Sequence, residues 1–277
     1  MGLSRRLLFA SALWEVARPR TALTAGHLLI RLSNPATAFD HRSAADWLLC
    51  HNAARQALVE VLGVRSLTMV FAHQWHPLGA AIGEPEAESS TPTFHLFGRW
   101  DGESIAPGAQ LRLPAQRRLP VPPEDLRKYD GGLRRELRRA ADAALTPTPD
   151  TPAPDTPAQD TAAPDTASRS ALFPGVRSGA PGNPAGPHHM VLTPERRIGA
   201  ISEVMPLELL ALAAAIQNLA GQPSVRGLSC VVPDSGAKGG AEGGGRLEVH
   251  ALGRSAGEDL NPLEFLLRSP EINAALL

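Results

Sequence analysis

Short apolar runs and one longer helical pattern alternate along the first part of the chain. Residues 26–30 form an apolar run typical of a buried strand, and residues 42–62 place apolar side chains at helical spacing. Two further apolar runs follow at 67–71 and 93–97, and the second precedes a Gly-Arg pair. The pattern predicts a strand, a helix and two strands, in that order.

The same order of elements returns in the second part of the chain. An apolar run at 189–192 precedes a helical pattern that begins at Pro206, a residue favoured in the first turn of a helix. Strand-like runs follow at 228–232 and 247–252, and the second again precedes a Gly-Arg pair. The last strand of each part therefore ends in His-x-x-Gly-Arg.

The histidines of the two parts have similar spacings. His27 and His95 are 68 residues apart, and His189 and His250 are 61 residues apart. Loops of different length absorb such a difference. We therefore predict an α+β fold of two related units, each an antiparallel sheet with a packed helix.

A change in composition separates these units. Residues 146–187 hold many prolines, threonines and aspartates and almost no large apolar side chains, so burial cannot offset the entropy of ordering them. We predict a disordered linker there, between a first domain at 1–145 and a second at 188–277.

The net charge of the chain is close to zero, but basic residues are concentrated in one segment just before this boundary. The 277 residues carry 27 basic and 28 acidic side chains, a net charge of −1 that argues against a polyelectrolyte partner for the whole chain. A predicted helix at 124–145, however, is rich in basic residues. It is either a phosphate or nucleic-acid surface or a solvated helix face, and its basic residues are Arg127, Lys128, Arg134, Arg135, Arg138 and Arg139.

Other features narrow the class of protein. Two cysteines, Cys50 and Cys230, are too few for a disulfide framework. No apolar run approaches the roughly 20 residues that span a bilayer, so no membrane partner is expected and a cytoplasmic protein is favoured. The apolar stretch after Arg5 and Arg6 has features of a secretion signal, but a first helix or strand is the favoured interpretation.

Four segments together resemble the histidine-triad (HIT) superfamily. Residues 25–30 (Ala-Gly-His-Leu-Leu-Ile) look like its early strand, and residues 91–99 (Thr-Pro-Thr-Phe-His-Leu-Phe-Gly-Arg) look like its triad strand. Residues 189–197 and 246–254 match the same two places. The resemblance covers about 14–100 and 188–260. It implies two divergent tandem copies that pair within the chain as a pseudo-dimer, or a homodimer.

The triad itself is degenerate in both copies. In the family, the middle histidine attacks the α-phosphorus of a nucleotide. Aligned on the Gly-Arg pair, Thr93 and Glu248 occupy that position here, and only His95 and His250 match the third histidine. A shifted register with His95 in the middle leaves Phe97 as the third residue. The catalytic candidates are therefore His95, His250, Thr93 and Glu248, and the family mechanism does not carry over.

The resemblance also implies where phosphate would bind. The candidates are His95, Arg99, His250, Arg254 and His73, while His27 and His189 are expected to be structural. His73 and His76, with His51 or His95, could form a metal site, but satisfied loop histidines are favoured and no metal or other cofactor is expected.

Three functions compete. The favoured one is a HIT-like protein that binds a nucleotide or dinucleoside polyphosphate with lost or reduced hydrolase activity. The second is an active nucleotidyl hydrolase or transferase that acts on diadenosine polyphosphates or nucleoside phosphoramidates. The third is a nucleic-acid-associated protein that uses the arginine-rich helix.

Overall fold

We describe the protein from a computed structural model, in which residues 6–73, 93–113, 117–146, 175–186, 188–234 and 245–253 and positions 267, 272, 275 and 276 are described. The strands are β1 (Leu7–Ala10), β2 (Trp14–Ala17), β3 (His27–Leu32), β4 (Ser66–His73), β5 (Thr93–Arg99), β6 (Val176–Gly179), β7 (His189–Pro194), β8 (Leu228–Asp234) and β9 (Val249–Gly253). The helices are α1 (His41–Leu62), α3 (Pro107–Leu111), α4 (Pro123–Leu145), α5 (Pro206–Ala220) and a short 3-10 helix, η5 (Ile201–Glu203).

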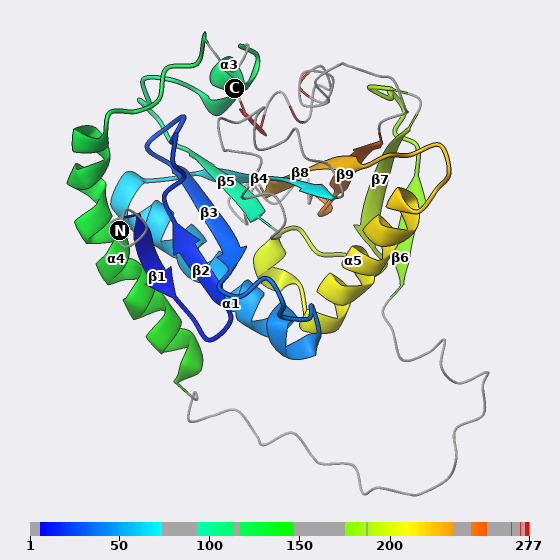
Figure 1. The fold of residues 1–277 in the computed structure, drawn as a ribbon, viewed down its shortest axis with the longest axis horizontal. Helices are drawn as coiled ribbons and strands as arrows, with labels where there is room; N and C mark the ends of the chain where they lie inside the picture. Colours follow the sequence, from blue (N-terminus) through cyan, green and yellow to red (C-terminus); the bar gives the residue numbers. More distant parts are fainter. Residues whose placement is uncertain are drawn as a thin grey trace, which may run out of the picture.

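All these strands belong to one antiparallel sheet, in the order β1-β2-β3-β5-β4-β8-β9-β7-β6 (Figure 1). At its centre β4 pairs with β8, from Leu67 opposite Asp234 to His73 opposite Leu228. On one side of this central pair come β5, β3 and β2, and on the other come β9, β7 and β6. The strand order is therefore the same on both sides of the β4–β8 pair, with β1 added at one edge.

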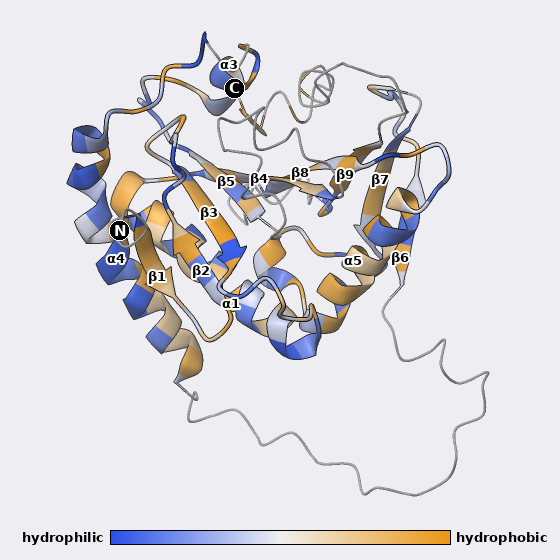
Figure 2. Ribbon diagram, viewed as in Figure 1, coloured by the Kyte–Doolittle hydropathy of each residue, from blue (hydrophilic) through white to orange (hydrophobic). Residues whose placement is uncertain are grey.

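The two faces of the sheet are covered differently. Helices α1 and α5 pack on one face (Figure 1), where alternate residues of the central strands, such as Met69 and Val232, join the larger apolar cluster. The intervening residues, such as Val70 and Val231, face the other way and pack with Leu267 near the C-terminus. Figure 2 shows the apolar colouring of the central strands. The opposite face is therefore not covered by α1 or α5.

Helix α1 packs against α4 as well as against the sheet. It begins after Asp40, whose carboxylate accepts a hydrogen bond from the Ser43 N–H at 2.9 Å, and ends at Gly63 with φ 70°. A β-carbon at Gly132 of α4 would lie 3.3 Å from the Val61 methyl groups of α1. The glycine therefore permits the close approach of the two helices.

The sequence predicted most of these elements. The helices expected at 42–62, 124–145 and from Pro206 are present, and so are the six strands expected in the two parts of the chain. The apolar N-terminal stretch forms strands β1 and β2. One prediction is wrong: residues 176–179, placed in the linker, form β6, because their backbone pairs with β7 from Val176 opposite Pro194 to Gly179 opposite Val191. Residues 147–174 and 187 of the predicted linker lie outside the described residues.

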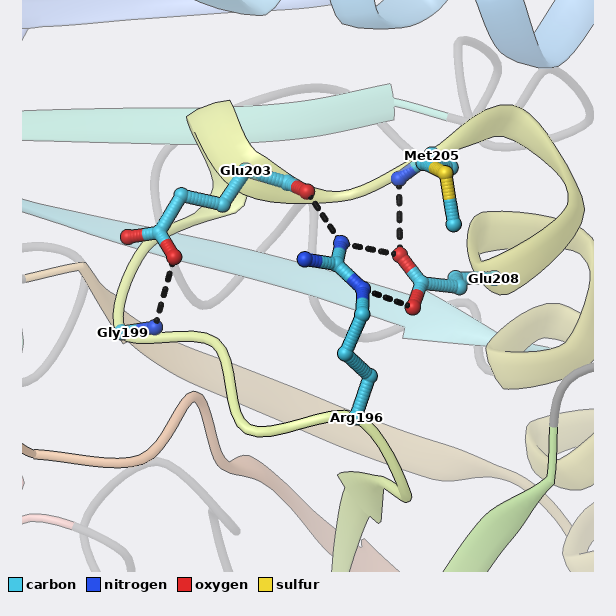
Figure 3. A network of polar contacts seen from close by, with 5 residues as sticks. All are labelled: Arg196, Gly199, Glu203, Met205 and Glu208. Carbon is cyan, nitrogen blue, oxygen red and sulfur yellow. Dashed lines mark hydrogen bonds and ion pairs between the residues drawn. The ribbon is translucent and has the colours of Figure 1, made fainter.

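A polar network fixes the start of α5 (Figure 3). Arg196, which follows β7, donates two hydrogen bonds of 2.7 Å to the carboxylate of Glu208 and one of 2.5 Å to the backbone carbonyl of Glu203. Glu208 also accepts a hydrogen bond from the Met205 N–H at 2.9 Å. These bonds from Arg196 hold the pKa of Glu208 below its ordinary value.

We expect Glu208→Gln to lower the free energy of unfolding by about 1 kcal/mol at neutral pH, since the part-buried hydrogen bonds to Arg196 lose the charge of the carboxylate. Because the pKa of Glu208 is lowered on folding, this contribution is complete above the ordinary value of 4.5 and disappears as the pH falls through the folded pKa. Urea unfolding at pH 7 measures the effect. Glu203→Gln is the matched control, because it keeps the carbonyl that Arg196 uses. Equal losses in both variants would contradict the prediction.

None of the helices in the described parts of the chain is long and apolar enough to cross a membrane.

Candidate functional site

Two histidines on neighbouring strands meet in the first half of the sheet. Nε2 of His27, on β3, lies 3.1 Å from Nδ1 of His95, on β5. The Leu23 N–H donates a hydrogen bond to Nδ1 of His27 at 3.2 Å. Both histidines are buried, with exposed fractions of 0% and 3%. Their neighbours in the chain, Leu28 and Leu96, face the α1 side, so the histidine pair lies on the opposite face.

The second half of the sheet repeats this arrangement. Nε2 of His189, on β7, lies 3.2 Å from Nδ1 of His250, on β9, and the Ala185 N–H donates to Nδ1 of His189 at 3.0 Å. Strands β7 and β9 hold the same places relative to β8 that β3 and β5 hold relative to β4. Both pairs therefore lie on the sheet face opposite α1 and α5.

The backbone N–H groups determine which ring nitrogens carry protons. A backbone N–H can only donate, so Nδ1 of His27 accepts, and the neutral ring carries its proton on Nε2. That proton is donated to Nδ1 of His95, whose own proton is then on its Nε2. The same reasoning, starting from the Ala185 N–H, places the proton of His250 on its Nε2. Each relay therefore ends in an N–H donor.

Burial keeps the first pair neutral. It lowers the pKa of His95 to about 3. The pKa of His27 is also well below its ordinary value, first because of burial and then because of the neighbouring His95 and Arg18. At neutral pH both rings are therefore uncharged, as the relay of hydrogen bonds requires.

The second pair opens into a cleft of about 610 Å³. Its polar side chains come from β6 and the segment after it, from β7, and from β9 and the residue before it: Arg177, Ser178, Asn183, His189, Thr193, Glu248 and His250. Glu248 lies two residues before His250, and its Oε2 is 3.5 Å from Nε2 of His250. A volume of this size is typical of small-molecule sites. We name this the histidine cleft.

The histidine cleft combines donors with one acidic group. The N–H of His250 and the guanidinium of Arg177 suit an anionic phosphate group, since guanidinium binds phosphate oxygens through paired N–H groups. Glu248, whose side chain is 42% exposed, would repel a phosphate beside it, but it can accept a hydrogen bond from a hydroxyl. The arrangement can hold a phosphate ester with a sugar hydroxyl.

The other predicted phosphate-binding residues that the structure describes lie outside the histidine cleft. Arg99 forms an ion pair with Glu103 at the end of β5. His73 is the last residue of β4 and lies on the face of the strand that packs against the helices. It lines a separate apolar cavity of about 430 Å³ with Trp47. Thr93 lies on β5 two residues before His95, on the same face by alternation. Arg254 lies outside the described residues.

The histidines of the alternative metal site are also separated. His51 lies on α1, with its Nε2 3.8 Å from the Asp234 carboxylate. His73 and His95 lie on opposite faces of the sheet, so one ion cannot contact both. His76 lies outside the described residues, and within the described ranges no three metal-ligating side chains cluster.

The basic residues of α4 divide into two groups. Lys128 pairs with Asp125 at 2.6 Å, and Arg139 and Arg135 lie 2.6 and 3.6 Å from Glu136. Arg134 is half-buried and donates to the carbonyl of Leu7 at 3.3 Å. The outward face is therefore partly neutralised by its own acidic residues, whereas Arg127 and Arg134 line a separate cleft together with Arg18.

Sequence reasoning missed the part played by His27 and His189. Both were expected to be structural, yet each lies within hydrogen-bond distance of a candidate histidine and sets its tautomer. A signal was present in the sequence. The separations of 68 and 61 residues that indicated a repeat are those of the two residue pairs that meet.

One comparison with known proteins bears on the fold. No family model matches the chain, and no curated protein matches it. A GalT-like protein from Arabidopsis thaliana superimposes with a TM-score of 0.51 at 11% identity, over 91% of this chain and 80% of that one. A uridylyltransferase mutant and a uridylyltransferase give TM-scores of 0.39 and 0.33 at 14% identity, over 90% of this chain and 77% and 75% of theirs. The similarity to the GalT-like protein shows a shared fold.

Proposed function

We propose that this chain is a HIT-type nucleotide-binding protein and that the histidine cleft holds the phosphate of its ligand. The observation that carries the proposal is the relay from the Ala185 N–H through His189 to His250, which ends in a cleft shared with Arg177. The relay fixes an N–H donor and Arg177 supplies positive charge. The resulting site is suited to a nucleotide or a dinucleoside polyphosphate.

The same relay argues for lost or reduced nucleotidyl transfer. A histidine attacks phosphorus through an unprotonated ring nitrogen. In His95 and His250, Nδ1 is occupied as an acceptor and Nε2 carries the proton, so neither neutral ring offers a free lone pair. Thr93 and Glu248, at the position of the middle histidine, do not replace imidazole chemistry. We infer that the protein binds its nucleotide without rapid turnover.

We further propose that residues 1–145 and 188–277 are two HIT-like copies, paired within one chain. The support is the identical strand order on either side of the β4–β8 pair and the identical position of the two histidine pairs. In this arrangement one chain contains both copies, so it forms by itself the dimer-like pair that two separate subunits would otherwise form. The part of the predicted linker that precedes β6 would connect the copies, since β6 pairs with β7 and belongs with the second copy.

Calorimetric titration with AMP and with diadenosine tetraphosphate tests the binding site. We expect the wild-type protein to bind, and Arg177→Ala and His250→Gln each to weaken binding by about tenfold, the loss of one charge-assisted hydrogen bond. Arg226→Ala, an exposed arginine outside the histidine cleft, is the matched control and should bind as the wild type does. Wild-type affinity in both site variants, or no binding by the wild type, would overturn the proposal.

Chromatography of the titrated samples tests turnover. We expect no more AMP release from diadenosine tetraphosphate than in the absence of protein. Release that His250→Gln abolishes would mean that His250 acts as the nucleophile and that the inferred tautomer is wrong.

A second candidate function is a nucleotidyl hydrolase or transferase that uses Glu248. The observation that favours it is the position of this carboxylate in the histidine cleft, 3.5 Å from Nε2 of His250. There the carboxylate would attack the α-phosphorus of diadenosine tetraphosphate, forming an acyl phosphate and expelling ATP, and water would then hydrolyse the intermediate to release AMP. This alternative would be favoured if the wild-type protein releases AMP and Glu248→Gln still binds the dinucleotide but releases none.

A further inference from the structure

A second cleft, of about 770 Å³, lies at the opposite end of the sheet from β6. It is bounded by the residues that flank the β1–β2 hairpin and by the first half of α4. Figure 1 shows this helix running alongside β1. Its charged lining consists of five arginines and one acidic residue: Arg6, Arg18, Arg20, Arg127, Arg134 and Asp130. We name this the arginine cleft. It shares no lining residue with the histidine cleft.

Arg18 is the buried member of this set, with an exposed fraction of 3%. Its Nε donates to Asp130 at 2.9 Å, and its Nη1 donates to the carbonyls of Ala25 and His27 at 2.6 and 3.1 Å. Its Nη2 is buried without a hydrogen-bond partner. The three hydrogen bonds fix the position of the guanidinium. A buried donor without an acceptor is costly, so an acceptor for Nη2 would stabilise the protein.

The remaining arginines add charge around this group. Arg127, Asp130 and Arg134 are three and four residues apart, so they share one face of α4, and this face turns toward Arg18. In the described parts of the chain, neither Arg6 nor Arg127 forms an ion pair. Asp130, the one acidic residue of the lining, is already bonded to Arg18. The described lining of the arginine cleft therefore carries five guanidinium groups and one carboxylate.

We propose that the arginine cleft binds an oligophosphate group, either free or as the phosphate chain of a small molecule. Guanidinium groups bind phosphate oxygens through paired N–H groups, and the unpartnered Nη2 of Arg18 lacks such an acceptor. The concave shape and the volume suit a small ligand. A nucleic acid would instead be expected to use the convex outer face of α4, where Glu136 partly neutralises Arg135 and Arg139.

Calorimetric titration with sodium tripolyphosphate tests the proposal. The full chain is used with Arg177→Ala as the background, so that phosphate binding in the histidine cleft contributes little. We expect Arg6→Ala/Arg127→Ala to weaken binding at least tenfold, because two charged donors are lost without disturbing a buried side chain. The matched control is Arg138→Ala/Arg139→Ala, two exposed arginines of the same helix outside the cleft, and it should change affinity less than about threefold.

Four outcomes distinguish the proposal from its rivals. Selective loss in Arg6→Ala/Arg127→Ala supports it. No binding, or equal weakening in both double variants, overturns it, and equal weakening indicates only diffuse attraction to the helix. A single-stranded oligonucleotide that binds more tightly than tripolyphosphate, and depends on Arg138 and Arg139, overturns it in favour of a nucleic-acid surface. Because the two clefts share no lining residue, failure here leaves the nucleotide-binding proposal unaffected.

Discussion

The substitution Val232→Asp is expected to lower the free energy of unfolding by about 4 kcal/mol, and both halves of the variant are expected to unfold in urea in a single transition. Val232 lies on β8 opposite Met69 of β4, where the two halves of the sheet meet, and its exposed fraction is 1%. A carboxylate there would face apolar side chains and lie two residues from the buried Asp234 on the same face. Its charge would be largely desolvated among these apolar side chains, which is costly.

The two native cysteines measure this unfolding, since each half holds one. Cys50 lies on α1 and Cys230 on β8, both are buried, and burial raises the pKa of the Cys50 thiol to about 12. The pKa of the Cys230 thiol is raised for the same reason. Because a thiol reacts as its thiolate, both should resist a disulfide reagent until the protein opens. We expect both to become reactive at the same urea concentration, and at a lower concentration in Val232→Asp.

The control for this prediction is Val59→Asp, the same change at an exposed position of α1. It should change the free energy of unfolding by less than about 1 kcal/mol. Exposure of Cys230 at a lower urea concentration than Cys50 would show that the halves unfold separately, and the role assigned to the β4–β8 pair would be wrong.

Acid is expected to destabilise the protein steeply below pH 6.5, in large part through His95. The pKa of His95 is about 3 in the folded protein because of burial, against an ordinary value of 6.5. The unfolded chain therefore binds a proton near pH 6.5 that the folded protein does not bind. Above pH 6.5 the histidine leaves stability unchanged, and from there toward pH 3 it lowers the free energy of unfolding by about 1.4 kcal/mol per pH unit. Between pH 7 and pH 5 its loss amounts to about 2 kcal/mol.

Urea unfolding of the wild type and of His95→Gln at pH 7, 6 and 5 checks this expectation. Glutamine does not titrate, and its side-chain oxygen can still accept the hydrogen bond from Nε2 of His27. His27 and His51 are also buried with lowered pKa values and add their own acid dependence. The comparison between wild type and variant therefore measures the part that depends on His95, including its effect on the pKa of His27. We expect the variant to lose less stability between pH 7 and pH 5. Parallel pH profiles would show that His95 is protonated in the folded protein.

Helices and strands followed closely from local patterns. The alternation of apolar and polar residues gave the helix at 41–62 and the strand at 228–234 to within a few residues, because apolar spacing directly reflects which face of an element is buried. The same method placed 176–179 in a linker. Its residues Val-Arg-Ser-Gly carry little apolar signal, and β6 forms because β7 offers it hydrogen-bond partners.

The candidate site was found only in part. His95 and His250 were identified from their place in a repeated strand pattern, and the structure places each in a hydrogen-bonded pair. His73 was included because it follows a strand, but the alternation of β4 turns it to the helix side. The arginine cleft was not foreseen, since Arg18 and Asp130 are 112 residues apart.

The sequence by itself determined the elements, their duplicated order and the pair of histidines that recurs in each part. These properties depend on side-chain spacing within short segments, where apolar burial and backbone preference act locally. Only the tertiary structure decided that β4 pairs with β8, that a backbone N–H sets each histidine tautomer, and that Arg18 keeps one donor without a partner. Strand order, register and the packing of distant segments determine such contacts, and no local pattern in the chain encodes which buried polar groups will meet.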